Sequence, residues 1–280
     1  MYERPDGVLM DRQDVAAAFR SFREQLIATL EGIERELGSD ACFERKAWDR
    51  TGGGGGEMGL LHGQVFEKAG VNYSLVEGEF SPEFAKTIPG TEDDRRFWAS
   101  GVSVVIHPAN PHVPAAHMNI RHLVTAERWF GGGADLTPVY PDECETSQFH
   151  DAFKVACDAI DLEYYPKFKA WCDRYFYLPH RQEPRGVGGI FFDQLASGQV
   201  EDDFRFTLSV GHAFEKVYAE LVRAKMRCEF TAAQRQDQLI KRGRYVEFNL
   251  LHDRGTLFGL KTGGNIEAIL MSLPPMVSWP

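Results

Sequence analysis

Three polar side chains recur at every second residue within the segment 116–124. They are His117, Asn119 and Arg121, and alternate residues of a β-strand point to the same face. The opposite, mainly apolar face would hold Met118, Ile120, His122 and Val124. An imidazole can move a proton near neutral pH, and a guanidinium binds carboxylates. A solvent-facing side is the alternative, but such a side more often carries Lys, Glu and Thr, so we predict an active site here.

The preceding strand-like segment, residues 101–107, has a similar pattern. Ser103 and His107 would share its polar face. Histidines occur at positions 107, 112, 117 and 122, but a step of five residues changes sides on a strand, so the four cannot form one metal-binding row. We therefore take His107 and His117 as the candidates for chemistry and interpret the other two as structural or surface residues.

Further polar groups accompany glycine-rich segments. Asp135 follows three glycines and a Trp-Phe pair, an apolar setting that would shift its pKa and suit acid–base work; a simple turn aspartate is the alternative. Arg185 precedes the glycine-rich residues 186–189, and an arginine beside such a loop suits carboxylate binding. Backbone amides of residues 263–265 could also hold an anion.

The surrounding segments predict both helices and strands. Asp11 is a candidate N-cap of a helix that ends at Gly38, and helices are predicted at 147–161, 164–177 and 203–225. Residues 245–251 and 256–261 are interpreted as a β-hairpin with a turn at 252–255. The five glycines at 52–56 lack the Gly-Lys-Ser/Thr of a phosphate loop and are interpreted as a mobile lid. Because strand segments cluster at both ends of a helical block, we predict an α+β fold.

Composition narrows the class of protein. The 280 residues are 43% hydrophobic, which suffices for a sizeable core, and the net charge of -10 argues against nucleic-acid binding. No apolar run approaches the roughly 18 residues that a membrane span needs. The start of the chain has no targeting signal, and the five cysteines lack C-x-x-C spacing. We therefore expect a cytoplasmic protein with no membrane span.

Seven motifs of the chain closely resemble those of the oxygen-dependent coproporphyrinogen III oxidase family, in order from about residue 13 to the C-terminus. The motifs are 101–108 (GVSVVIHP), 111–121 (PHVPAAHMNIR), 129–138 (WFGGGADLTP), 164–173 (YYPKFKAWCD), 186–193 (GVGGIFFD), 243–249 (GRYVEFN) and 269–274 (ILMSLP). Long motifs of this kind are highly specific.

The resemblance implies an α+β fold with a large, mainly antiparallel sheet flanked by helices on both sides, in a single domain 1–280 whose residues 1–10 are a candidate disordered tail. It implies an enzyme of haem biosynthesis that converts two propionates of coproporphyrinogen III to vinyl groups. Protoporphyrinogen IX, CO2 and H2O2 would be the products, with O2 as the acceptor. The implied partners are the substrate, O2 and a second copy of the chain. No organic cofactor is implied, and a divalent metal such as Mn is a candidate.

The resemblance also implies roles for individual residues. His117 would be the proton donor, Asp135 would face the pyrrole nitrogens, and Arg121 would act beside them. The substrate-binding residues would be Ser103, Asn119, Ile120, Arg121, Gly263, Gly264 and Asn265. The metal ligands would be His107, His117, His150 and His180. The region from about residue 245 onward would contribute to the dimer.

Two positions depart from the family pattern. Asn265 and Glu57 stand where the family usually has arginine, and both changes remove positive charge that a propionate could contact. Two other functions remain open at this point. One is a non-haem iron oxygenase that uses His107, His117 and Asp135 as ligands, and the other is a non-catalytic tetrapyrrole carrier.

Overall fold

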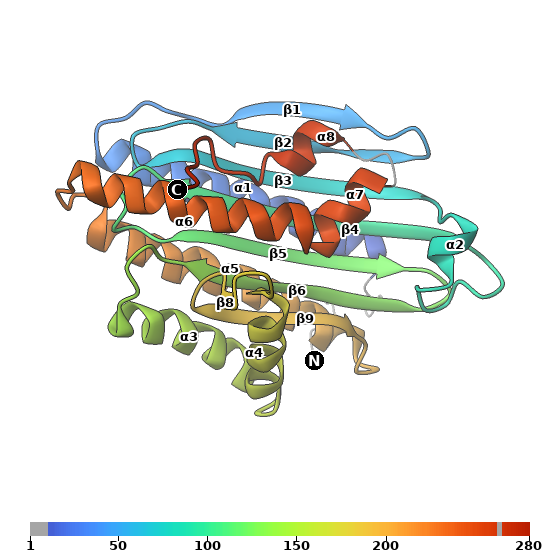
Figure 1. Cartoon of the computed structure of the whole chain (residues 1–280). Helices are drawn as coiled ribbons and strands as arrows, with labels where there is room; N and C mark the ends of the chain where they lie inside the picture. Colours follow the sequence, from blue (N-terminus) through green and yellow to red (C-terminus); the bar gives the residue numbers. More distant parts are fainter. Residues whose placement is uncertain (1–10, 262–264) are drawn as a thin grey trace.

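The computed structural model describes residues 11–261 and 265–280, and its centre is one large antiparallel sheet (Figure 1). Neighbouring strands pair in the order β1-β2-β3-β4-β5-β6-β9, and every pairing is antiparallel. The strands are β1 (Glu44–Asp49), β2 (Gly54–Leu61), β3 (Phe66–Glu79), β4 (Arg96–Pro108), β5 (Ala115–Val124), β6 (Arg128–Thr137) and β9 (Gly188–Leu195). A small hairpin joins β7 (Tyr177–Leu178) to β8 (Glu183–Pro184).

Helices cover both faces of this sheet, which confirms the predicted fold class. The helices are α1 (Arg12–Glu36), α2 (Pro82–Ala85), α3 (Glu143–Asp158), α4 (Tyr164–Tyr175), α5 (Val200–Lys225), α6 (Ala232–Leu251), α7 (Arg254–Lys261) and α8 (Ile266–Leu270). In Figure 1, α1 and α5 lie behind the sheet, whereas α6, α7 and α8 lie in front of it. We call these sides the core face and the polar face.

The core face holds the main hydrophobic cluster. Side chains from α1, α3 and α5 interlock there with alternate residues of β3 to β6 and β9. Helix α1 starts as predicted, because the Asp11 side chain accepts hydrogen bonds from the backbone N–H groups of Gln13 and Asp14. Helix α4 packs along β9 at the edge of the sheet, so that Phe168 enters the core cluster while Cys172 and the following Phe176 join a smaller cluster on the polar face.

The predicted hairpin at 245–261 is wrong, because both of its arms are helical. Thr231 caps α6 through a reciprocal pair of hydrogen bonds with Gln234, and the buried residues of α6 follow helical spacing. Asp253, interpreted as a turn residue, instead accepts hydrogen bonds from the N–H and hydroxyl of Thr256 at the start of α7. A short apolar run such as 245–251 has no periodicity that separates strand from helix.

The glycine run at 52–56 is not a lid. Gly54, Gly55 and Gly56 belong to β2 and pair with both β1 and β3. A Cβ at Gly56 would lie 2.6 Å from the ring of Trp48, so the missing side chain makes room for an indole on β1.

The described helices include none that is long and apolar enough to cross a membrane.

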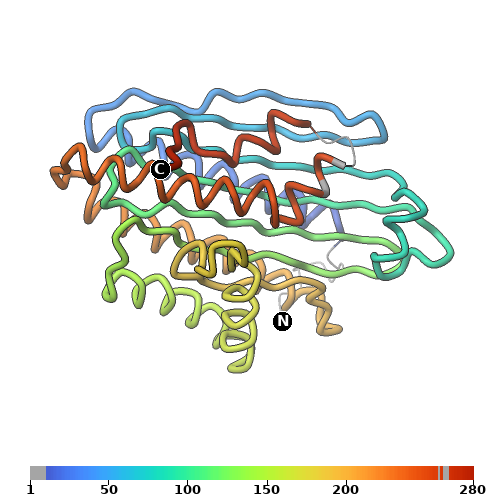
Figure 2. The backbone as a smooth tube through the Cα atoms, in the orientation of Figure 1, coloured from blue at the N-terminus to red at the C-terminus, as the bar shows by residue number. Residues whose placement is uncertain are grey.

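After α8 the chain returns along the polar face beside α6 (Figure 2). The Ser278 N–H donates to the carbonyl of Leu239. The carbonyl of Leu273 accepts from Lys68 Nζ at 2.7 Å, and that of Ala268 accepts from Asn72 Nδ2 at 3.1 Å. These contacts hold the C-terminal segment against α6 and β3, so the end of the chain covers part of the polar face.

Candidate active site

The polar face carries the side chains that the strand pattern predicted. His117, Asn119 and Arg121 are half-buried, whereas Met118 and Ile120 between them are fully buried in the core cluster. Strand register places His117 opposite Asp135 on β6, and Ser103 on β4 opposite Asn119. The alternation of β4 and β5 is thereby confirmed.

Asp135 lies on strand β6 and not at a turn, and it has 1% of its surface exposed. His117 Nδ1 lies 3.0 Å from Asp135 Oδ1, and Arg185 Nη2 lies 2.6 Å and 2.7 Å from the two carboxylate oxygens. Burial alone would raise the pKa of Asp135, but the Arg185 charge and the contacts with His117 hold that pKa below its ordinary value. Asp135 is therefore an ionised carboxylate, and the apolar setting expected from the Trp-Phe pair does not control it.

Arg185 is the second buried ion of this pair, with 2% of its surface exposed. Its guanidinium carbon lies 4.1 Å from the ring centre of Phe176, 4.5 Å from Tyr245 and 4.7 Å from Phe248. Its Nη1 donates to Asn249 Oδ1 at 3.0 Å. Burial alone would lower the pKa of Arg185, but the Asp135 carboxylate raises it above its ordinary value. The expectation that Arg185 binds substrate carboxylates is wrong for this arrangement, because Asp135 and three rings enclose it.

A chain of contacts continues from His117 along β5. Arg121 Nη1 donates to Asn119 Oδ1 at 2.8 Å, and Asn119 Nδ2 lies 3.3 Å from His117 Nε2. Because Oδ1 of Asn119 accepts from Arg121, its Nδ2 is the donor toward His117. In the neutral ring, Nε2 is then the acceptor and Nδ1 carries the proton toward Asp135. This assignment makes Nε2 of His117 the basic atom of the site.

Glycines occupy β6 beside these side chains. On β6, Gly131 and Gly133 share the face of Asp135 and pair with Arg121 and Asn119. Gly133 has φ of 149°, and a Cβ there would lie 2.2 Å from the carbonyl oxygen of Ile190, so no side chain is accommodated. We call Gly131 and Gly133 the glycine strip. It lies between the polar side chains of β5 and Phe191 of β9, and both of its glycines are buried.

Comparison with known proteins shows the family to which the chain belongs. The chain matches the family described as Coproporphyrinogen III oxidase over residues 14–280. The chain belongs to this family. A Rickettsia akari (strain Hartford) protein named oxygen-dependent coproporphyrinogen-III oxidase is 58% identical over 266 residues, which cover 93% of this chain and 95% of the relative. One of the same name from Rickettsia bellii (strain OSU 85-389) is 55% identical over 274 residues, covering 96% and 98%.

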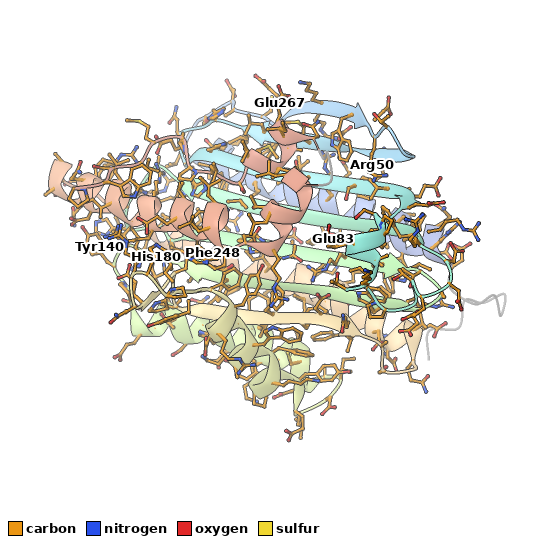
Figure 3. All side chains as sticks on the ribbon, turned by 45° about the vertical axis from the view of Figure 1, so that its right-hand side comes forward. Arg50, Glu83, Tyr140, His180, Phe248 and Glu267 are labelled. Carbon is orange, nitrogen blue, oxygen red and sulfur yellow. The ribbon has the colours of Figure 1, made fainter. Side chains whose placement is uncertain are left out.

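The four histidines expected to bind a metal in this family do not fit a metal site. His107 donates from Nε2 to the Ser272 carbonyl at 2.9 Å, and burial lowers its pKa to about 3. His150 donates to the Val187 carbonyl at 3.0 Å, while His180 lies at the surface beside α6 (Figure 3), 2.8 Å from Glu247. Residues 11–261 and 265–280 contain no group of three or more His, Cys, Asp or Glu side chains that could hold a metal ion. The iron-oxygenase triad of His107, His117 and Asp135 is therefore not assembled either.

The expected substrate residues separate into four groups. Ser103, Asn119 and Arg121 share the polar face, as predicted. The Ile120 side chain points into the core, so only its backbone could meet a ligand. Gly263 and Gly264 lie outside the described residues. Asn265 caps α8 by accepting from the N–H groups of Glu267 and Ala268.

The second departure from the family pattern, Glu57, is neutralised within the chain. Its carboxylate contacts the guanidinium of Arg23 on α1, whose residue surface is 1% exposed. Glu57 is thus part of the contact between α1 and β2. A replacement by arginine here would face Arg23, so the charge at this position is linked to its neighbour on α1.

Sequence reasoning missed three contributors to the site. Asp193 on β9 forms an ion pair with Arg121. Asn249 on α6 accepts a hydrogen bond from Arg185. The hydroxyl of Tyr175 on α4 donates to Asp253 at 2.9 Å. The alternation of 189–193 could have placed Asp193 on the same face as Phe191. The other two contacts join segments 64 and 78 residues apart and have no local signal.

Proposed function

We propose that this chain oxidatively decarboxylates coproporphyrinogen III to protoporphyrinogen IX. The observation that carries the proposal is the Asp135 carboxylate, which Arg185 keeps ionised and which contacts His117 on a face that also carries Arg121. At each of two propionates, the side chain loses CO2 and a hydride equivalent to become a vinyl group. One O2 accepts that hydride equivalent with one proton and becomes H2O2, so atoms and electrons balance.

Proton movement falls to His117. We propose that Nε2 takes a pyrrole N–H proton once the substrate displaces the Asn119 amide from it, after which the imidazolium gives a proton to reduced oxygen. Both oxygens of Asp135 already have partners, and the residue is 1% exposed. We therefore propose that Asp135 acts through His117, by holding the Nδ1–H tautomer and stabilising the imidazolium. The proposed proton transfers use only side chains of this chain, because His107, His150 and His180 do not fit a metal site.

Substrate binding falls to the other polar groups of the same face. The side chain of Arg121 is 35% exposed, and its guanidinium suits a propionate carboxylate. Ser103 on β4 lies opposite Asn119 on β5, and Asn119 in turn lies opposite Gly133 of the glycine strip. The tetrapyrrole itself supplies the reductant, because its unconjugated pyrroles are rich in electrons.

Turnover of coproporphyrinogen III in air tests this function. We expect a dicarboxylic porphyrinogen, CO2 and H2O2, absent from a protein-free control and lost in His117→Ala. Tight binding without oxygen uptake would support the carrier instead. Turnover that disappears with a chelator and returns with iron would support the oxygenase.

The proposed homodimer has support on the polar side of the molecule. Exposed apolar side chains gather on α6, α7, α8 and the C-terminal segment, and they are Leu250, Leu251, Leu260, Ile266, Met276 and Trp279. Light scattering after size-exclusion chromatography would test the dimer, and Leu251→Asp is expected to weaken it. We also propose a cytoplasmic location, which fractionation of the cells would test.

A further inference from the structure

Asp193 faces Arg121 across the glycine strip. Arg121 Nη2 lies 2.9 Å from Asp193 Oδ1, and the two side chains are 35% and 30% exposed. Both lie directly over Gly131, because a Cβ there would be 2.8 Å from Arg121 Nε and 2.8 Å from Asp193 Oδ1. The absence of a side chain at Gly131 is therefore what permits this ion pair to cross β6.

An irregularity in the sheet directs Asp193 toward Arg121. The register of β6 and β9 shifts between Phe130 and Gly132, so that Asp193 and Gln194 together lie opposite Gly131. Gln194 has a φ of 51°, which is unusual for a residue with a side chain, and its N–H donates to Asp193 Oδ1 at 3.0 Å. Bulges of this kind commonly redirect a side chain beside an active site.

We propose that Asp193 is a positioning residue that fixes Arg121 for a propionate of the tetrapyrrole. A guanidinium has five N–H donors. Arg121 gives one to Asn119 and turns Nη2 toward Asp193, so the guanidinium is held at two points while the side chain remains 35% exposed. The stacking of the same group over Phe191, at 5.9 Å, adds a third restraint. The inference rests on the proposed function, because it assigns the carboxylate that Arg121 receives.

An exposed pair of this kind contributes little to folding, so its effect should appear in binding. Asp193→Ala is expected to raise KM for coproporphyrinogen III about tenfold with kcat within about twofold, because an interaction equal in ground and transition states is lost. Asp193→Asn keeps a hydrogen-bond acceptor and should raise KM less. Glu36→Ala is the control: it breaks a somewhat more exposed ion pair with Arg223 on the core side of the sheet, at 2.8 Å, and should leave KM unchanged.

Gly131→Ala tests the same pair independently. The nearest atoms to its new Cβ are the ends of two flexible side chains, so the substitution should separate Arg121 from Asp193 with little strain on the backbone. We expect a rise in KM similar to that of Asp193→Ala and no further rise in the double variant, since both remove one interaction. Additive effects would overturn the proposal.

Two outcomes distinguish the inference from the function on which it rests. If wild-type protein fails to turn over coproporphyrinogen III, the proposed function falls, and the affinity for coproporphyrin by fluorescence titration then tests Arg121 directly. Asp193→Ala should weaken that affinity about tenfold as well. An unchanged KM and affinity would overturn the positioning role, and tighter binding would show that Asp193 competes with the ligand carboxylate.

Discussion

His117 and His122 lie five residues apart on β5 and point to opposite faces of the sheet. His117 is half-buried and contacts Asp135 and Asn119. His122 is 1% exposed, its ring stacks on Phe130 at 4.3 Å, and neither of its nitrogens has a hydrogen-bond partner in the described part of the chain. The same residue type is thus a member of a polar network on one face and a packing element on the other.

This difference shows what stabilises each face. The core face depends on apolar side chains that interlock between the sheet and helices α1 and α5. The polar face contains the buried Asp135–Arg185 pair, in which each charge is tolerated because an opposite charge or a hydrogen-bonding group meets it. Removing one member of a charged pair therefore costs stability on the polar face, whereas removing volume costs stability on the core face.

Asp135→Ala should give the largest effect. It leaves the Arg185 charge buried without its partner, which costs about 3–5 kcal/mol in the free energy of unfolding. It should also reduce turnover by at least roughly a hundredfold, the scale of lost acid–base catalysis. Urea denaturation and product formation measure the two effects.

A double variant separates these two consequences. Asp135→Ala combined with Arg185→Met removes both charges and fills the space among the three rings, so stability should recover in large part. Turnover should stay low, because His117 still lacks its carboxylate. If Asp135→Ala alone were as stable as the wild type, the buried pair would not have the role assigned to it.

Ile120→Ala should give the next effect, on the core face. Ile120 lies between Asn119 and Arg121 in the sequence, but its side chain is fully buried in the core cluster. The loss of its side chain should cost about 2–5 kcal/mol, and Ile120→Val about 0.5–1.5 kcal/mol. KM of the folded protein should not change. A large change in KM without a loss of stability would place Ile120 at the substrate, contrary to the structure.

Local patterns predicted part of this arrangement from the sequence. The alternation of 117, 119 and 121 gave the correct face, and Asp11 with Gly38 gave the correct ends of α1. Such features depend on neighbours within a few residues. The hairpin predicted at 245–261 failed for the same reason, since α6 is specified by a cap at Thr231 fourteen residues earlier and by packing of its buried side against the sheet.

The electrostatics of the site could not be predicted in the same way. Asp135 and Arg185 are 50 residues apart, and their sequence contexts predicted different tasks, acid–base work for Asp135 and substrate binding for Arg185. Their contact depends on β6 pairing with β9 and on α4 bringing Phe176 under the guanidinium. Histidine spacing likewise could not show that His107 and His150 already donate to backbone carbonyls.

His122→Phe should give the smallest effect on stability at neutral pH. It tests the core face through the dependence of folding stability on acidic pH. A phenyl ring can keep the stack on Phe130 without two unpartnered nitrogens, so stability at pH 7 should rise by about 1 kcal/mol or stay unchanged. Burial, with a smaller contribution from Arg128, lowers the pKa of His122 from 6.5 to about 4. Between those values the unfolded chain binds a proton that the folded chain does not, so wild-type stability falls as the pH drops.

The variant should escape this part of the acid loss. The pKa difference of His122 corresponds to about 3 kcal/mol at pH 4, from about 1.36 kcal/mol per pKa unit. His107, with its pKa lowered to about 3, remains in both proteins, so the difference between their urea midpoints from pH 7 to pH 4 isolates His122. Parallel stability curves would mean that His122 is protonated in the folded protein, which its burial against Phe130 and Trp98 opposes.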